Sequence, residues 1–198
     1  TKKVCILYNK GYKKCEKYDE NNEKINITYK DLTYTNMYIF ELAKSYDNIL
    51  ILEDDFLFTK YIKNQNNINN VVNFIKSNKP ELYLLGCLPL IQNIFTIFGK
   101  HNKLYVKMGT HAVIYSKVSR KKVFDIYKSR KSLKTDIDLL TNNLEIYTYQ
   151  KPLCIQTFPE TENKKSWGKN IPFNLHVIPL KILNTYLNTL EMDKEENI

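Results

Sequence analysis

The sequence has few of the features that mark zinc-binding, membrane-spanning or repeat proteins. Its four cysteines never form a Cys-x-x-Cys pair, which argues against the common kind of structural zinc site. No apolar run is long enough to cross a bilayer and no signal peptide is evident, so we expect a cytoplasmic chain without a membrane span. No internal repeat is found. What is left is an ordinary globular protein of 198 residues, enough for one sizeable domain.

Acidic residues are the minority among the charged ones. The chain carries 21 Asp and Glu against 30 Lys and Arg, and its formal net charge is +9. Such a balance favours anionic partners, which include nucleic acid, acidic lipid and phosphate-bearing small molecules. The excess lysine is spread through Lys- and Asn-rich segments and no single helix face collects it, so charge alone does not choose among these partners.

Three acids follow directly after a short apolar run. Residues 49–52 (ILIL) predict a buried strand, and Glu53, Asp54 and Asp55 come next. Carboxylates are costly inside a core, so we expect them at the end of the strand, in the crevice where open α/β sheets bind ligands. Glu53 and Asp55 alternate onto one face and are the predicted ligands of Mg²⁺ or Mn²⁺ bridging to a diphosphate. Asp54 points elsewhere, toward a sugar or a backbone amide. The alternative is an acidic turn that only closes a strand.

Two other segments carry side chains suited to substrate binding. Gly109, Thr110 and His111 lie between two predicted strands, and a glycine there lets the backbone approach a ligand closely. His111 is either a metal ligand or substrate contact, or a histidine packed in a β-bulge. Trp167 is the only tryptophan. It is either a wall of an acceptor groove, because aromatic faces pack against sugar rings, or a core anchor.

Asp136 and Asp138 open a short predicted helix. Carboxylates are favoured at a helix N-terminus, so one interpretation is plain capping with Asp136 as the cap. The other places Asp138, with Asp136 as second candidate, across the cleft from the metal site. There it accepts the proton of an acceptor hydroxyl or holds that hydroxyl in line.

Strands alternate with helices over the first half of the chain, which predicts one α/β domain over residues 1–198. We expect a mostly parallel central sheet flanked by helices, with the acidic strand in its centre. Residues 87–103 are expected to form an irregular connection, and Asp31 to cap a helix. An amphipathic helix at 179–192 is expected to pack on the body of the domain. The predicted strands are 4–8, 49–52, 82–85, 106–108, 112–115, 145–149 and 152–156, and the other predicted helices are 31–44, 66–78, 119–128 and 136–142.

Four segments occur in an order that resembles glycosyltransferase family 25, which holds bacterial lipopolysaccharide glycosyltransferases and collagen galactosyltransferases. The likeness is greatest to forms found in large DNA viruses, which implies the host cytoplasm as the location. The segments are 49–58 (ILILEDDFLF), 109–116 (GTHAVIYS), 135–139 (TDIDL) and 147–158 (YTYQKPLCIQTF).

The resemblance implies a GT-A-like nucleotide-binding fold, a divalent cation (Mn²⁺ or Mg²⁺) and a UDP- or GDP-sugar donor. The sugar is transferred to a glycan, protein or lipid-linked acceptor. Carried over by position, Glu53 and Asp55 bind metal or nucleotide, and Asp138 or Asp136 faces the acceptor. Such domains usually open with a strand that holds the nucleotide base. Here residues 4–8 (VCILY) either substitute for that strand, or it lies upstream of Thr1.

Two other classes of function compete with this interpretation. Clustered carboxylates with basic charge also suit a metal-dependent nuclease or phosphoryl-transfer enzyme, although no third acidic strand end is evident for a two-metal site. A basic chain with 15 tyrosines also suits a module that stacks single-stranded nucleic acid. Many of these tyrosines fall inside the helical and strand patterns, so we expect half-buried roles for them and no nucleic-acid partner.

Overall fold

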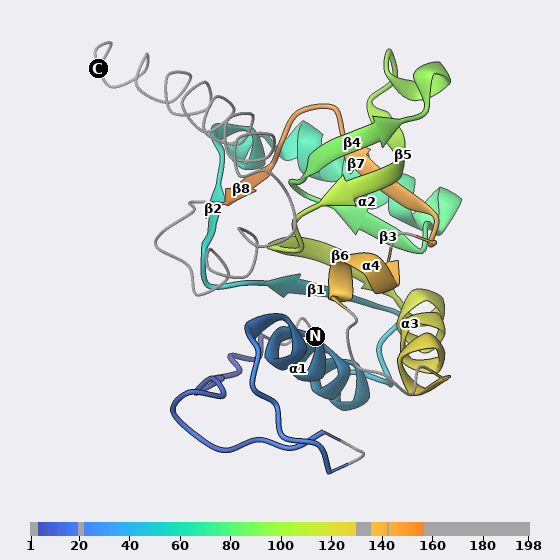
Figure 1. The fold of residues 1–198 in the computed structure, drawn as a ribbon. Helices are drawn as coiled ribbons and strands as arrows, with labels where there is room; N and C mark the ends of the chain where they lie inside the picture. The colour runs from blue at the N-terminus through green and yellow to red at the C-terminus, as the bar shows by residue number, and fades with distance from the viewer. Residues whose placement is uncertain (1–3, 20–21, 130–135, 142, 157–198) are drawn as a thin grey trace, which may run out of the picture.

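A computed structural model describes residues 4–19, 22–129, 136–141 and 143–156 (Figure 1). Trp167 and the helix predicted at 179–192 therefore lie outside the described residues. The helices are α1 (Thr28–Leu42), α2 (Gln65–Asn78), α3 (Lys117–Ser129) and α4 (Ile137–Thr141), with 3-10 turns η1 (Lys60–Lys63) and η2 (Ile94–Thr96). The strands are β1 (Asn48–Leu52), β2 (Phe56–Phe58), β3 (Leu82–Leu84), β4 (Leu88–Gln92), β5 (His101–Met108), β6 (Ala112–Ser116), β7 (Ile146–Tyr149) and β8 (Cys154–Gln156).

Six strands form one sheet in the order β1-β6-β3-β7-β5-β4, and β2 pairs with β8 separately. Only β3 and β7 are parallel neighbours in the described sheet, while β1–β6, β3–β6, β5–β7 and β4–β5 are antiparallel. The chain is thus mixed α/β, but the prediction of a mostly parallel sheet is wrong. One reason is that residues 87–103, expected to be irregular, contain β4 and the start of β5. These two strands form a hairpin, and a hairpin makes its strands antiparallel.

The acidic strand is also placed differently from the prediction. β1 lies at an edge of the described sheet and not in its centre. Leu50 and Leu52 are 45% and 36% exposed, so the expectation of a buried strand is also wrong. The neighbouring strand β6 runs antiparallel to β1, with Leu52 opposite Ala112 and Asn48 opposite Ser116. This register puts the end of β1 next to the start of β6. The acids that follow Leu52 therefore meet the residues that precede Ala112, which is the contact on which the candidate site is built.

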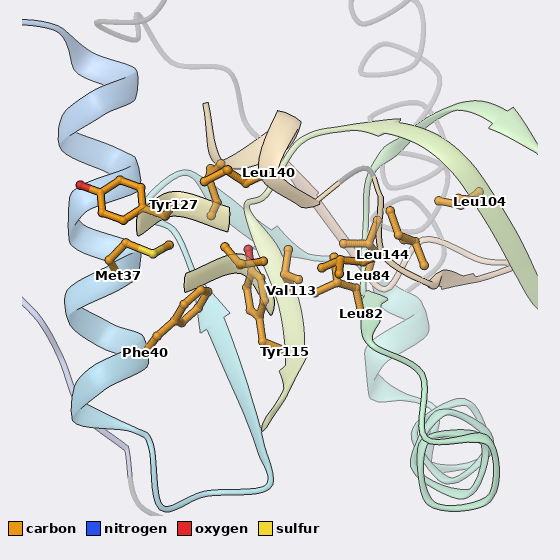
Figure 2. Packing of buried hydrophobic residues seen from close by; sticks show 13 residues of the cluster. Met37, Phe40, Leu82, Leu84, Leu104, Val113, Tyr115, Tyr127, Leu140 and Leu144 are labelled. Atoms are coloured by element: carbon orange, nitrogen blue, oxygen red, sulfur yellow. The ribbon is translucent and has the colours of Figure 1, made fainter. Parts of the chain in front are cut away.

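Helices cover both faces of the sheet because alternate strand residues are apolar on both. On one face, Leu82 and Leu84 of β3 and Val113 and Tyr115 of β6 pack with α1, α3 and α4 (Figure 2). On the other face, Tyr83 packs with Val71 of α2. Strand β3 is buried on both sides, which accounts for the continuous apolar run at 82–84. Within the described residues, no helix combines the length and the apolar character that a membrane span requires.

The N-terminal segment differs from the prediction. Residues 4–8 form no regular secondary structure, and Val4 and Ile6 are each 90% exposed, so the strand expected there is wrong in the described structure. Helix α1 begins at Thr28, and Asp31 lies in its first turn and is not its cap.

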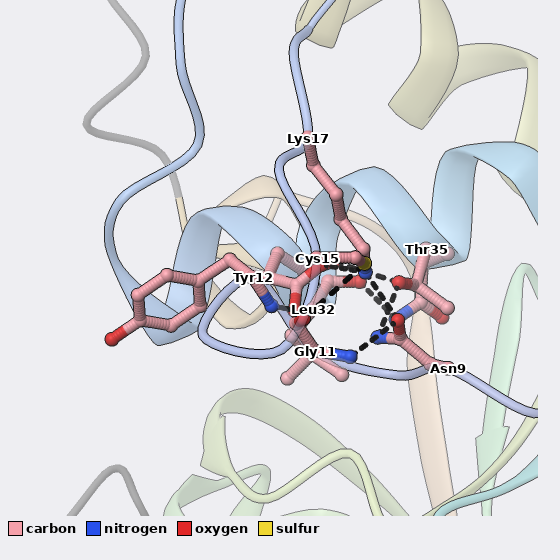
Figure 3. A network of polar contacts seen from close by, with 9 residues as sticks. Asn9, Gly11, Tyr12, Cys15, Lys17, Leu32 and Thr35 are labelled. Carbon is pink, nitrogen blue, oxygen red and sulfur yellow. Dashed lines mark hydrogen bonds and ion pairs between the residues drawn. The ribbon is translucent and has the colours of Figure 1, made fainter.

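The buried carboxylate of Asp31 instead binds the chain segment that precedes the helix (Figure 3). Asp31 accepts a hydrogen bond from the Tyr12 backbone N–H (2.9 Å) and forms an ion pair with Lys17. Asn9 donates from its side chain to Thr35 Oγ1 (2.9 Å). These polar contacts hold residues 9–17 against α1 where no strand pairing does so.

Candidate functional site

The turn after β1 contacts the turn before β6 through two hydrogen bonds. The Glu53 backbone N–H donates to the carbonyl of His111 (2.9 Å), and Thr110 Oγ1 donates to Glu53 Oε1 (2.7 Å). Gly109 has a φ of +96°, a conformation that glycine adopts without strain. The structure thus brings together two segments that the sequence analysis named separately. The turn at Gly109 places Thr110 within hydrogen-bond distance of Glu53.

The other two acids of the triplet take different positions. Asp55 Oδ2 accepts a hydrogen bond from the side-chain amide of Gln156 (2.6 Å), which belongs to β8. Asp55 also lies close enough to Glu53 and His111 to act on the pKa values of both. Asp54 is exposed. Glu53 and Asp55 are thus partly buried and Asp54 is exposed, while the joint role of Glu53 and Asp55 stays a prediction.

A buried lysine lies near enough to Glu53 to affect its pKa, and the sequence analysis missed it. The Lys107 side chain is 1% exposed and its ammonium group forms an ion pair with Asp138 Oδ1. The positive charge of Lys107 also favours the ionised forms of Glu53 and Asp136, and so lowers their pKa values. One signal was present in the sequence: Lys107 stands inside a predicted strand, two residues before Gly109, where an inward lysine needs a charged partner.

The two acids of α4 have separate roles in the described structure. The Asp136 backbone carbonyl accepts from Leu139 and Leu140, and its side chain accepts from the Asp138 backbone N–H (3.1 Å). Asp136 therefore caps α4, as one of the two interpretations held. Asp138 is half-buried and turns to Lys107. Both acids thus belong to the same charged cluster as Glu53.

Burial and crowding of acids change how these groups ionise. Burial, with smaller contributions from the charges of Asp55 and Asp138, raises the pKa of Glu53 to about 7, although the Thr110 hydrogen bond and Lys107 oppose the rise. Burial and the neighbouring Asp138 likewise raise the pKa of Asp136. Carboxyl groups with raised pKa values, set beside a buried cation, are typical of functional sites.

His111 is a tightly packed ring in this site. Both ring nitrogens are buried and neither makes a hydrogen bond of ordinary geometry to the described residues. A Cβ atom at Gly86 would come within 3.0 Å of Nε2, and one at Gly109 within 3.2 Å of Nδ1. Burial lowers the pKa of His111, although Asp55 and the backbone of Cys154 favour the charged form. Direct contact of His111 with a ligand therefore requires the ring to move.

Gly86 is essential to this packing for a separate reason. A Cβ atom there would lie 1.7 Å from the carbonyl oxygen of Cys154, which no side chain can accommodate. The Cys154 and Leu153 backbone N–H groups both donate to the carbonyl of Leu85. The end of β3 and the start of β8 therefore touch backbone to backbone, and this contact sets β8, with Gln156, beside Asp55.

The side chains near Glu53 offer few ligands for the predicted divalent cation. Among the described residues, no three His, Cys, Asp or Glu side chains group closely enough to hold a metal ion alone. Mg²⁺ commonly binds through one or two carboxylates while phosphates and water complete its shell. Glu53 and Asp55 offer carboxylate oxygens of that kind, and a cation bound there with a diphosphate stays a prediction.

Comparison with known proteins adds no family. No protein-family model matches the chain, and no curated protein matches it either. The likeness to family 25 accordingly depends on the quoted motifs alone.

Proposed function

We propose that this chain is a glycosyltransferase that moves a sugar from a nucleotide-diphosphate donor to an acceptor hydroxyl. One observation carries the proposal. Three acid- or histidine-bearing segments, at 53–55, 109–111 and 136–138, were each named from the sequence as parts of such a site, and they lie near one another. Thr110 donates to Glu53, and Asp138, which acts on the pKa of Glu53, pairs with the buried Lys107.

The chemistry asked of the protein groups is modest. The acceptor oxygen bonds to the anomeric carbon, the bond from that carbon to the diphosphate oxygen breaks, and the hydroxyl proton passes to a carboxylate. Asp138 is the proposed acceptor of that proton, or the group that aligns the hydroxyl, with Asp136 as the second candidate. When bound by Glu53 and Asp55, Mn²⁺ or Mg²⁺ supplies positive charge for the departing diphosphate. Lys107 adds a fixed positive charge beside Asp138.

The proposal includes two features of a GT-A-like fold, namely a sheet between helices and an acidic motif at the end of a strand. Support comes from a sheet with helices on both faces, and from acids placed where strand β1 ends. UDP- or GDP-sugars are the proposed donors, and glycans, proteins or lipid-linked glycans the proposed acceptors. Thr110, which already donates to Glu53, and the exposed Asp54 are proposed contacts to the donor, and the exposed position of Asp54 suits the sugar.

Asp55→Asn is expected to abolish Mn²⁺-dependent donor binding without unfolding the protein, because a half-buried carboxylate at a turn adds little to packing. The measurement is thermal stability with UDP- and GDP-sugars, with and without Mn²⁺. A true donor at about a hundred times its dissociation constant adds roughly 2.7 kcal/mol to the free energy of unfolding. Asp54→Asn is the matched control, since Asp54 is the adjacent exposed acid and is proposed to touch only the sugar. It should keep the response to Mn²⁺ with free UDP or GDP.

Asp138→Asn is expected to separate transfer from binding. It should lower the rate of transfer by two orders of magnitude or more, on the scale of roughly 10²–10⁴-fold for a general base, and leave donor affinity nearly unchanged. If the rate of transfer and the donor affinity fall by the same factor, Asp138 contributes to donor binding and not to the transfer step. Cleavage of plasmid or RNA by the native protein, with no response to any nucleotide-sugar, would favour the nuclease instead.

A further inference from the structure

The hairpin of β4 and β5 ends in an apolar tip that stands clear of the rest of the described chain (Figure 1). The side chains of Phe95 and Phe98 are 89% and 98% exposed. Ile94, just before them, is 67% exposed, and Ile97, between them, is 45% exposed. A large apolar side chain that is almost fully exposed contacts nothing in the fold. Two such side chains, Phe95 and Phe98, with the partly exposed Ile94 and Ile97 beside them on one tip, are unusual for a surface that meets only water.

The tip is an ordered structure, because its polar side chains are used to build it. Asn93 accepts from the Phe95 backbone N–H (3.0 Å) and so caps the turn η2. The Thr96 hydroxyl donates to the Asn93 carbonyl (2.9 Å) and accepts from the Lys103 backbone N–H (2.9 Å). In the segment NIFTIF the two polar residues therefore hold the turn together, while the four apolar residues are left outside. This inverts the usual pattern of a surface loop.

The surroundings of the tip are basic. The sequence holds no Asp or Glu from residue 82 to residue 124. Lys100 is exposed at the base of the tip. Its backbone carbonyl accepts from the Gln150 N–H (2.9 Å), which brings the exposed Lys151 close to the same base. A projecting apolar tip above exposed lysines combines the two attractions that draw a protein to an anionic bilayer.

We propose that this tip inserts into the headgroup region of an anionic lipid membrane and holds the protein on its surface. The segment 94–98 is convex, and a lipid surface receives a convex tip without a complementary groove. Phe95 and Phe98 enter the apolar boundary, while Lys100 stays at the level of the lipid phosphates. A single tip of this size gives reversible surface binding and no span. The proposal concerns a different part of the molecule from Glu53 and Lys107, and it does not depend on the reaction catalysed there.

The test is co-sedimentation of the full chain with phosphatidylcholine vesicles that contain or lack phosphatidylserine. The native protein should bind the anionic vesicles, and Phe95→Ser/Phe98→Ser should reduce the partition coefficient by roughly tenfold or more, given the apolar area removed. The control is Leu42→Ser/Val118→Ser, which removes two exposed apolar side chains from α1 and α3 and should bind like the native protein. Melting curves should show the Phe95→Ser/Phe98→Ser protein still folded, since these side chains contact nothing.

Three results would overturn the proposal. The first is failure of the native protein to bind either kind of vesicle. The second is equal binding by the native protein and the double phenylalanine variant, which would mean that basic charge alone attracts the protein to the vesicles. The third is a native oligomer, seen by sedimentation equilibrium, that the double variant does not form although its vesicle binding is unchanged, which would make the tip a contact between copies of the chain.

Discussion

Replacing Lys107 with methionine is expected to lower the free energy of unfolding by up to about 3 kcal/mol, because it leaves the half-buried carboxylate of Asp138 without its ion-pair partner. Lys107 is the ion-pair partner of Asp138, and it opposes the upward shift in the pKa of Glu53. Methionine keeps most of the volume and removes the charge. Urea unfolding near neutral pH measures the loss.

The chain offers a matched control for this variant on the same strand. Lys103 also forms an ion pair, with Glu145 at 3.0 Å, but both side chains are partly exposed. Exposed pairs contribute little, so Lys103→Met should cost less than about 1 kcal/mol. Lys107→Met combined with Asp138→Asn should recover part of the stability, because the second change neutralises the unpaired carboxylate. Equal losses for Lys107→Met and Lys103→Met would mean that Lys107 does not hold the buried charge we assign to it.

Glu53→Gln is expected to make the metal-free protein more stable at about pH 8, by about 1–3 kcal/mol, while abolishing donor binding. Burial raises the pKa of Glu53 to about 7, above its ordinary value of 4.5. Between these values the folded protein holds a proton that the unfolded chain has released. Stability therefore falls as the pH rises from about 4.5 through about 7, and the loss is complete above about 7. Glutamine carries no charge, so it avoids this loss, and its amide oxygen still accepts from Thr110.

The measurement is the free energy of unfolding between about pH 4 and pH 8 in the presence of a chelator. The gain from Glu53→Gln should shrink to nothing at the acid end, where Glu53 is protonated in both states. Asp54→Asn serves as the control, since an exposed acid should give no comparable gain. A Glu53→Gln protein that is less stable than the native chain at every pH would show that Glu53 has a structural role. The expected result is the opposite, a residue kept for function at the expense of stability.

The local elements of this protein were largely predictable from its sequence. The run at 49–52 is β1, and the helix expected at 66–78 is α2, which begins after the cap Asn64. The strand expected at 112–115 is β6 and the helix expected at 119–128 lies within α3. These elements follow from apolar periodicity, capping residues and turn residues, all of which act between neighbours in the chain. The same local rules placed Asp136 at the start of α4.

Strand direction and strand pairing were not predictable in this way. The alternation of strands and helices suggested parallel neighbours, yet β6 lies antiparallel between β1 and β3. The apolar residues 4–8 have the composition of a strand, but they pair with none of the described strands. Pairing depends on which edges meet after collapse, and this is a property of the whole sheet.

The sequence by itself determined which side chains carry the candidate chemistry: the acids at 53–55 and 136–138 and the segment Gly109–His111. Only the tertiary structure decided that they meet, because the contact depends on the register of Leu52 opposite Ala112 and on the turn at Gly109. The tertiary structure also showed that Lys107 is buried and pairs with Asp138, a partner that its place in a predicted strand does not identify. Burial makes the difference, since the free energy of a charged group depends on the polarity and the charges around it, and distant segments of the chain supply these.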